Sequence, residues 1–374
     1  MLTKSDELMC HQIVSTFDCV VDSNRNWTEK TYFEAWDKSG KAIVCTGIGK
    51  YPNRNVMDGY ASVALMDRQY TVHSSRELAP DRDAAKIGPI SYEVVEPLKS
   101  IRLCLGKNDY GISFDLVFEG TILPMEEPEG LTRIGGQLIN HTVRYYQMGV
   151  ASGKIMVEGK TYEVKKDSWE CMRDHSWGIR ALTGGMPEPG LQPMPQRPGW
   201  FAGIFMMEFK DYCFFDTYSE DAAGNPMKVG TTGQGGYLVY RYGDPRPPML
   251  ITKDKFRFEF FPGTRHLKSI EGSITLADGT TRQLSMKSLG IHCYGYPHGY
   301  LAGYKGRWQG KWMGPFHLDG EMHDLADKKV VHELLRGGSC DVILECRCGD
   351  DVGYGVFQYV ASGELPLYGI KKEG

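Results

Sequence analysis

Apolar and polar residues alternate along much of the chain with a period of two. Residues 101–105 and 112–118 each place their apolar side chains at every second position, and a polar turn lies between them at 106–109. Because successive side chains of a β-strand point to opposite faces, this pattern predicts an antiparallel hairpin with one apolar face. The same alternation around short turns predicts further hairpins over 155–164, 201–218 and 274–286.

Helical patterns are rare. The best candidate follows Ser5, where Leu8, Met9, Ile13 and Phe17 recur at helical spacing. The chain has 374 residues, of which 45 are glycine and 11% are aromatic, and the glycines follow no collagen-like period. Glycine dispersed among aromatic residues is typical of many tight turns between short strands. We therefore predict an all-β fold class with little helix.

One segment divides the chain into halves of nearly equal length. Residues 183–199 contain five prolines and four glycines, a composition that disfavours regular structure. We predict an N-terminal domain at 1–183, a linker at 184–199 and a C-terminal domain at 200–374. Each half is rich in strands and long enough for one antiparallel barrel or a strongly curved sheet. A large barrel has an interior suited to lipophilic ligands.

The charge balance and the cysteines narrow the class of protein. Lys and Arg number 43 against 47 Asp and Glu, a net charge of -4, whereas a nucleic-acid binder needs a basic surface. The start of the chain has no apolar signal-peptide core and no run approaches 18 apolar residues, so we expect a cytoplasmic protein without a membrane span. The ten cysteines lack zinc-site spacing, which predicts free thiols.

A short polar and aromatic segment just before the predicted linker carries the strongest chemical pattern. In the run 173–180, His175 and Trp177 alternate with Asp174 and Ser176. If this run is a strand, His175 and Trp177 share one face and Asp174 lies on the other. For Asp174 we favour an ion pair with a neighbouring arginine over a catalytic role. For His175 and Trp177, ligand contact and simple packing are equally good interpretations.

The chain resembles the superfamily of carotenoid 1,2-hydratase (hydroxyneurosporene synthase) and AttH-type proteins. The most specific shared element is the Asp-His-Ser-Trp-Gly-Ile-Arg run, 174–180. The resemblance implies two lipocalin-like antiparallel β-barrel domains in tandem, with a hydrophobic cavity, and it implies this fold more firmly than any reaction. Weaker matches extend over most of the chain, at 27–33, 93–103, 145–149 and 353–356.

The same resemblance implies site residues. In the carotenoid hydratases a His-x-Trp pair and a downstream Tyr-x-Asp carry the proton chemistry; His175 and Trp177 match the pair, and Phe214-Phe215-Asp216 matches the second motif with phenylalanine in place of tyrosine. Tyr218 lies two residues after Asp216 and could supply the missing hydroxyl. A carboxyl group flanked by aromatic residues loses solvation, so we expect a raised pKa for Asp216. The alternative is that Asp216 is a surface residue.

Further residues are candidates for lining a ligand site or a metal site. Candidates for substrate contact are Phe214, Tyr146, His292 and Tyr294. The residues His317, Asp319, Glu321 and His323 alternate and would converge on a straight strand, with metal-ligand chemistry. We expect a turn at Asp319-Gly320 to break that alternation. The sequence therefore predicts no metal site.

Three functional interpretations follow from these observations. The first is a cofactor-independent lyase, a hydratase or dehydratase acting on a lipophilic alkene or alcohol such as an isoprenoid or polycyclic aromatic compound. In it Asp216, helped by Tyr218, is the acid, Asp174 is the next candidate, Trp177 stabilises a carbocation and His175 positions water. The second is an isomerase or cyclase of a polyene or polyketide. The third is a non-catalytic binder of lipophilic ligands. None needs a cofactor, and a homodimer is left open.

Overall fold

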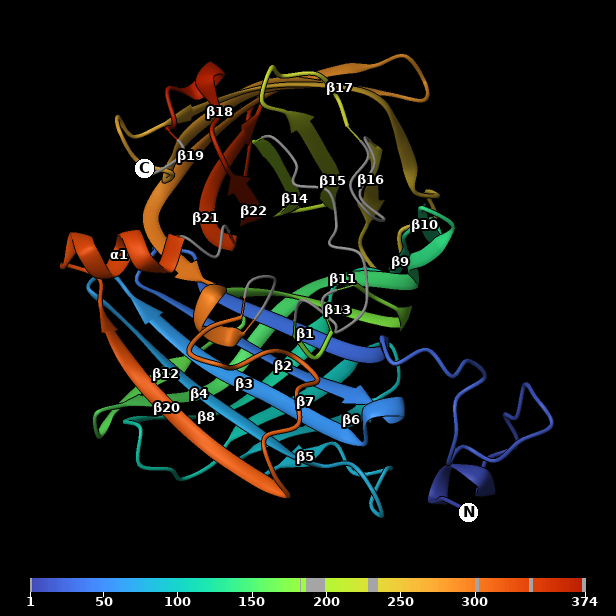
Figure 1. Ribbon diagram of the computed structural model, residues 1–374. Coiled ribbons are helices and arrows are strands. Elements are labelled where there is room, and N and C mark those ends of the chain that lie inside the picture. Colours follow the sequence, from blue (N-terminus) through green and yellow to red (C-terminus); the bar gives the residue numbers. More distant parts are fainter. Residues whose placement is uncertain are drawn as a thin grey trace.

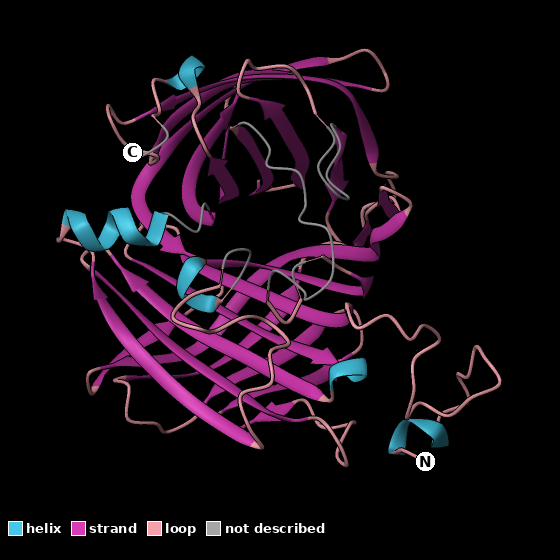
Figure 2. Cartoon of the chain, in the orientation of Figure 1, coloured by secondary structure: helices cyan, strands magenta, loops and turns pink. Residues whose placement is uncertain are grey.

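We describe a computed structural model of the chain that covers residues 2–181, 183–185, 199–227, 235–299, 303–335 and 339–371. Strands dominate it, and helices are few and short (Figure 2). Across these ranges one α-helix and four 3-10 helices occur: η1 (Lys4–Glu7), η2 (Pro52–Arg54), η3 (Tyr296–His298), α1 (Lys328–Leu335) and η4 (Pro366–Tyr368). The predicted all-β fold class is confirmed.

The first unit is an open, curled sheet, which lies below the second unit in Figure 1. Its main path joins eleven strands, and three short strands pair with β11 off that path. In spatial order the path runs β20 (Phe316–Asp324), β4 (Arg68–Glu77), β3 (Val56–Leu65), β2 (Ala42–Tyr51), β1 (Trp27–Asp37), β13 (Trp169–Ile179), β11 (Gln137–Val157), β8 (Ile112–Gly120), β7 (Ser100–Leu105), β6 (Ile90–Glu96) and β5 (Lys86–Ile87), with β9 (Met125–Glu126), β10 (Gly130–Ile134) and β12 (Lys160–Val164) on β11.

The second unit is a closed barrel of eight antiparallel strands (Figure 1). Closure is made by β14, which pairs with both β15 and β22. A closed barrel has no free strand edge, whereas the curled sheet ends at β5 and β20. Around the barrel the strands are β14 (Trp200–Glu208), β15 (Tyr212–Asp221), β16 (Gly235–Tyr240), β17 (Met249–Phe260), β18 (Leu267–Leu276), β19 (Thr281–Tyr294), β21 (Ser339–Cys348) and β22 (Asp351–Ser362).

Two parts of the predicted domain organisation need correction. The N-terminal unit is a curled half-barrel and not a closed barrel. In addition β20, which the predicted boundary assigns to the C-terminal domain, leaves the barrel between β19 and β21 and pairs with β4 over nine residues. The edge of β4 offers unpaired backbone groups, and β20 satisfies them. The predicted linker lies largely outside the described residues.

Alternating side chains build three apolar clusters. One fills the closed barrel and a second covers the inner face of the curled sheet. The third lies between the two units and takes side chains from the outer faces of both. In β15, for example, Phe214 and Tyr218 point into the barrel while Cys213 and Phe215 point to the layer between the units. Because both of its faces are buried, this strand contains few exposed residues.

The predicted hairpins are present, but the predicted helix is not. The four predicted hairpins are present as β7–β8, β11–β12, β14–β15 and β18–β19. The helix predicted after Ser5 is wrong: only the four-residue η1 forms there, and Leu8 and Met9 are exposed, so no apolar face is buried to stabilise a longer helix. All ten cysteines are free thiols. No helix in the described ranges is long and apolar enough to cross a membrane.

Candidate functional site

The sequence motif of greatest interest lies on β13, at the middle of the curled sheet. Odd-numbered side chains of this strand, among them Cys171 and His175, point to the inner face, where Cys171 joins the apolar cluster. Trp177 follows on the same face and is 37% exposed. The prediction that His175 and Trp177 share one face is therefore met, and that face is partly open to solvent.

His175 is held on both sides of its ring. Its Nε2 lies 3.0 Å from Glu29 Oε1 on β1, and its Nδ1 lies 3.2 Å from Tyr145 Oη on β11. Strand register places both neighbours. Tyr145 of β11 pairs directly with His175, and Glu29 of β1 pairs with Trp177, two residues further along β13. Three adjacent strands thus align a carboxylate, an imidazole and a phenol in one hydrogen-bonded row.

Aromatic rings surround this row. The ring centroids of His175 and Trp177 lie 5.4 Å apart, and those of Tyr145 and His175 lie 5.5 Å apart, both in edge-to-face arrangements. Tyr145 and Trp177 contact each other in the same way at 6.5 Å. Edge-to-face packing restricts the rotation of all three rings. The exposed face of Trp177 therefore has a defined orientation relative to the phenol.

Arg173 continues the row inward. Its Nη1 donates to Tyr145 Oη at 3.4 Å, and its Nε and Nη2 donate to Gln147 Oε1 at 2.9 and 2.7 Å. Gln147 is itself fixed by donation to the backbone oxygens of Leu98 and Ile122, both at 2.8 Å. A buried and well-partnered arginine beside a phenol oxygen stabilises negative charge on that oxygen. Arg173 is thus a positioning residue for Tyr145.

The electrostatics favour a charged carboxylate at the outer end of the row. The hydrogen bond from His175 holds the pKa of Glu29 below its usual range. Burial raises the pKa of Tyr145, although the nearby Arg173 guanidinium opposes that rise. At neutral pH the row therefore contains an anionic Glu29 and a protonated Tyr145. Such a row can donate a proton from the phenol and stabilise the resulting phenolate.

Asp216 lies in the other unit, on the inner face of the closed barrel. It is completely buried and shares that face with Phe214 and Tyr218, as predicted. One carboxyl oxygen accepts from the backbone N–H of Thr217 at 2.9 Å, and the other has no hydrogen-bond partner. Burial, with the nearby Asp254 carboxyl, raises the pKa of Asp216 well above its usual range. The environment suits a protonated acid.

The structure does not bring the two predicted halves of the site together. His175 lies on the inner face of the curled sheet, Asp216 lies inside the barrel, and the apolar cluster between the units separates the two faces. Tyr218 donates a 2.7 Å hydrogen bond to Glu220 inside the barrel. The roles predicted for Asp216 and Tyr218 stay predictions, since a substrate on His175 would not reach them.

Asp174 and Tyr146 face the layer between the units. Asp174 Oδ2 lies 4.0 Å from Arg144 Nε, close to the ion pair that the sequence favours, although the partner is Arg144 on β11 and not a sequence neighbour. Arg144 also donates to the Tyr146 hydroxyl, and the Tyr146 ring lies 5.0 Å from that of Phe215. Burial raises the pKa of Asp174. Both residues are part of the packing between the two units.

The two other predicted contact residues line the barrel interior. The Tyr294 hydroxyl lies 2.8 Å from His266 Nε2, and the His292 and His266 ring centroids are 4.6 Å apart. Burial lowers the pKa of His292 to about 3, so this ring is neutral. Both residues are packed there against His266, and their role in substrate contact stays a prediction.

A pair of buried acids lies between the units, and sequence analysis missed it. Tyr32 donates to Asp341 Oδ2 at 2.8 Å and also lies 3.1 Å from Glu34 Oε2, which accepts from Gln358 at 2.9 Å. Burial raises the pKa of Asp341 to about 7 and that of Glu34 well above its usual range. Cys45, on the neighbouring strand, is 3.5 Å from the Tyr32 hydroxyl. These residues meet only through contacts between segments far apart in sequence, so no local sequence pattern indicates the pair.

The predicted turn at Asp319-Gly320 is wrong. β20 runs without interruption from Phe316 to Asp324, because its backbone pairs with β4 along its whole length. His317, Asp319 and the two following alternate residues therefore do lie on one face. Among the described residues, two groups bring metal-ligand donor atoms close together. One group contains His317 and Asp319 of this face together with His73, and the other is Glu34, Cys45 and Asp341.

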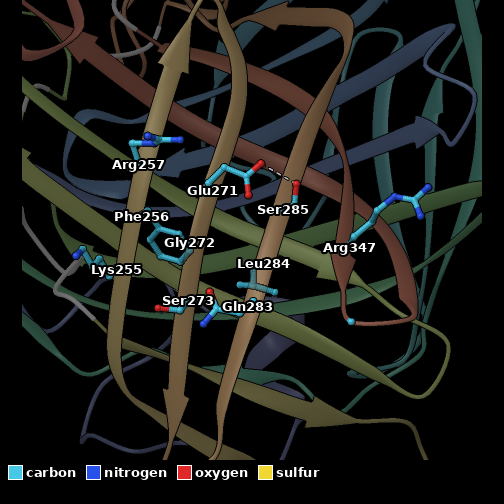
Figure 3. A pocket seen from close by; sticks show the side chains of 11 residues that line it. Lys255, Phe256, Arg257, Glu271, Gly272, Ser273, Gln283, Leu284, Ser285 and Arg347 are labelled. Carbon is cyan, nitrogen blue, oxygen red and sulfur yellow. Dashed lines mark hydrogen bonds between the residues drawn. The ribbon is translucent and has the colours of Figure 1, made fainter.

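A hollow on the barrel strands β17, β18, β19 and β21 is lined by none of these residues (Figure 3). Its volume is about 540 Å³, and charged side chains such as Arg257, Glu271 and Arg347 line it. Glu271 accepts a 2.8 Å hydrogen bond from Ser285 across the strands. On the inner face of the curled sheet, a hollow of about 10 Å³ lies among apolar residues that include Phe33 and Phe118. Neither hollow contains a predicted site residue.

Two residues of the hydrogen-bonded row were missed as site residues by sequence analysis. Glu29 and Tyr145 lie within the segments that carry the family resemblance, but neither stood out as a candidate. The signal that could have found them is position: each belongs to a strand that the resemblance covers, with the same alternation as β13. Their pairing with His175 follows from strand register.

Comparison with known proteins supports the fold. The model of a family of unknown function, DUF8625, matches residues 2–371, and no curated protein matches the chain. Three solved structures are similar: an AttH candidate from Nitrosomonas europaea (12% identity, 89% of this chain and 92% of that chain, TM-score 0.51), kievitone hydratase from Nectria haematococca (11%, 89% and 89%, 0.42) and CghA with Sch210972 (11%, 94% and 90%, 0.45). The likeness to the Nitrosomonas europaea structure shows, for this chain, the fold that the predicted resemblance implies.

Proposed function

We propose that this chain, which belongs to the DUF8625 family of unknown function, is a cofactor-independent lyase that adds water to, or removes it from, a lipophilic alkene or alcohol. The observation that carries this proposal is the row Glu29–His175–Tyr145 on the partly exposed inner face of the curled sheet. A phenol held by a histidine–carboxylate pair is a proton donor and acceptor that resets itself.

In the dehydration direction Tyr145 gives up one proton and takes one back, so the row ends in its starting protonation state. Tyr145 donates its proton to the leaving hydroxyl, the C–O bond breaks and water departs. The resulting phenolate then removes a proton from the neighbouring carbon, which forms the double bond and restores the phenol. Hydration is the same sequence in reverse. While the phenolate exists, the hydrogen bond from Arg173 stabilises it, and Glu29 holds the His175 ring beside the phenolate oxygen.

The surroundings favour a lipophilic substrate. Arg173 lies over the Phe118 ring, 5.3 Å from its centroid, and Phe118 belongs to the apolar cluster of the inner face. Phe33 contacts the Tyr92 ring at 5.8 Å on the same face. The exposed ring of Trp177 can stabilise a developing carbocation, an effect worth up to about 2 kcal/mol when water is excluded. An apolar floor with one proton-transfer group at its edge fits this substrate class.

Substrate conversion by the purified chain tests the proposal. Lipophilic alkenes and alcohols are incubated with wild-type protein and with Tyr145→Phe and His175→Gln, and products are followed by mass spectrometry for gain or loss of 18 Da, the mass of water. We expect each variant to lose about 10²- to 10⁴-fold in turnover, with ligand affinity little changed. Tyr162→Phe, an exposed tyrosine on β12, is the matched control and should retain activity.

Asp216→Asn distinguishes the acid. If the barrel residue is the proton donor, as the family resemblance implies, Asp216→Asn loses turnover while Tyr145→Phe keeps it, and the site moves into the barrel. Products of unchanged mass would support the isomerase or cyclase interpretation. Ligand binding without conversion of any compound, equal in all variants, would leave a binding protein. Each of these outcomes contradicts the lyase site proposed at Tyr145.

A further inference from the structure

Strand β20 brings a second set of reactive side chains to the edge of the curled sheet. His317 and Asp319 alternate along this strand and share one face, and Asp319 pairs directly with His73 of β4, which places all three on that face. His73 is only 2% exposed, whereas His317 and Asp319 are partly exposed. His73 is far from the other two in sequence, so only the pairing of β20 with β4 joins them.

The donor atoms of these residues face one another at distances suited to a shared ion. His73 Nδ1 lies 3.6 Å from Asp319 Oδ1, and His317 Nε2 lies 3.4 Å from Asp319 Oδ2. One donor atom from each residue can be chosen so that all three lie within 4.8 Å of one another. Atoms bound at about 2.0–2.1 Å to one tetrahedral ion are roughly 3.3 Å apart. Small side-chain rotations would complete that geometry.

Three of the facing atoms make no hydrogen bond. His73 Nδ1, His317 Nε2 and Asp319 Oδ1 are all buried atoms without a hydrogen-bond partner. A buried polar atom left unpartnered costs about 1–3 kcal/mol in general, and most such atoms in folded proteins are satisfied. A single cation bound by these three residues would satisfy such atoms together.

The surroundings orient the carboxylate for this role. Arg307, itself buried, donates from Nε to Asp319 Oδ2 at 2.9 Å, which leaves Oδ1 directed to His73. A further nitrogen of Arg307 donates to Glu321 Oε1 at 2.6 Å, so Glu321 balances the arginine charge. Metal-binding carboxylates are commonly held in this way by outer hydrogen bonds.

We propose that His73, His317 and Asp319 bind a divalent first-row transition-metal ion, with Zn²⁺ as the representative ion. Two imidazoles and one carboxylate are a ligand set that such ions prefer. The partial exposure of His317 and Asp319 gives a further coordination position to water or to a ligand. His73 points away from the inner face of the sheet, since it pairs with Tyr60 of the cluster between the units, so this site is separate from Tyr145 and independent of the proposed lyase activity.

Metal binding at this position would fasten β20 to the first sheet. β20 belongs by sequence to the second half of the chain and by pairing to the first sheet. A metal bound by one residue of β4 and two of β20 cross-links these strands in the folded state only, so it raises the unfolding temperature by mass action.

The test uses the full chain without a histidine tag. The protein is dialysed against a chelator and titrated with ZnCl₂ by calorimetry, and Co²⁺ absorption in the visible range reports the coordination geometry. We expect one Zn²⁺ per chain, at least 10- to 100-fold weaker binding by His317→Gln and Asp319→Asn, and a rise in unfolding temperature with Zn²⁺ that both variants lack.

Two controls locate the ion. His141→Gln removes an exposed histidine that pairs with Glu129 elsewhere, and Cys45→Ser disables the other group of close donors; both variants should bind Zn²⁺ as the wild type does. Circular dichroism of the metal-free variants checks folding, and His317→Gln alone decides the matter if Asp319→Asn unfolds through loss of its contact with Arg307. Absence of Zn²⁺ binding, equal affinity in His317→Gln, or loss in Cys45→Ser would overturn the proposal.

Discussion

The inner face of the curled sheet and the interior of the closed barrel differ in the exposure and hydrogen bonding of their polar side chains. On the open face, His175 is bonded at both nitrogens and Trp177 is exposed beside it. In the barrel, Asp216 is completely buried with one oxygen unpartnered, among rings such as Phe205 and Phe256. The first arrangement leaves polar groups partly exposed, and the second buries a carboxyl group among apolar side chains.

The difference indicates that closure of the sheet into a barrel, more than the type of residue, determines whether polar side chains lie in a packed core or on an accessible face. A closed barrel has its interior filled by its own side chains, here largely aromatic. A sheet that stops short of closure leaves part of its inner face accessible, and there Glu29 keeps a pKa below its usual range while burial pushes that of Asp216 upward.

The largest expected effect is on stability in the barrel. Phe205 is fully buried and stacks on Phe357 with centroids 4.2 Å apart, so Phe205→Ala should cost about 3–5 kcal/mol of unfolding free energy through lost contacts and a cavity. Trp177→Ala on the open face should cost about 1 kcal/mol or less, despite the larger ring. Urea denaturation of both variants measures the contrast. Equal losses would mean that the open face is as tightly packed as the barrel.

Asp216→Asn should change how stability depends on pH. Because the folded pKa of Asp216 lies well above the unfolded value, the folded state holds a proton that the unfolded state has released, and stability falls as pH rises above about 4. Asp216→Asn removes this loss and should be more stable than wild type at pH 7 by about 1–2 kcal/mol, with little difference near pH 4. Denaturation at both pH values tests this. Asp278→Asn is the opposite control, since backbone donation lowers the pKa of that exposed residue.

Asp341, which is buried in the layer between the two units, should also affect how stability depends on pH. Burial raises the pKa of Asp341 to about 7, so wild-type stability should also decline between about pH 4 and pH 7 because of this residue. Asp341→Asn should remove this part of the decline, since Tyr32 can still donate to the amide oxygen. Denaturation from pH 4 to pH 8 follows the difference. A pH profile identical to wild type would place the proton on Glu34 throughout.

The smallest expected effect on stability is at Glu29. Its carboxylate is half exposed and pairs with His175 at 3.0 Å, so Glu29→Gln should change the unfolding free energy by less than about 1 kcal/mol. Turnover should nevertheless fall at least 10-fold, because His175 loses the carboxylate that orients its ring beside Tyr145. Parallel measurement of stability and turnover separates the two effects. A large stability loss with unchanged turnover would make Glu29 a structural residue of the inner face.

Local sequence pattern determined a large part of this protein. Alternation alone predicts the hairpin of β14 with β15 and places Phe214, Asp216 and Tyr218 on one face, and it does the same for His175 with Trp177. These are properties of the extended backbone, whose side chains alternate whatever the strand later pairs with. The all-β fold class follows from the same local rule, repeated along the chain.

Tertiary structure alone decided which faces meet and which are open. Tyr145 reaches His175, and His73 reaches Asp319, only through pairing between strands far apart in sequence. The crossing of β20 to β4 also depends on an edge that the first sheet leaves unpaired, a feature without a local signal. Pairing and closure depend on the packing of the whole chain, because each strand selects the partner that satisfies its backbone and buries its apolar face. Alternation tells which side chains share a face, and only the packed fold tells whether that face meets solvent.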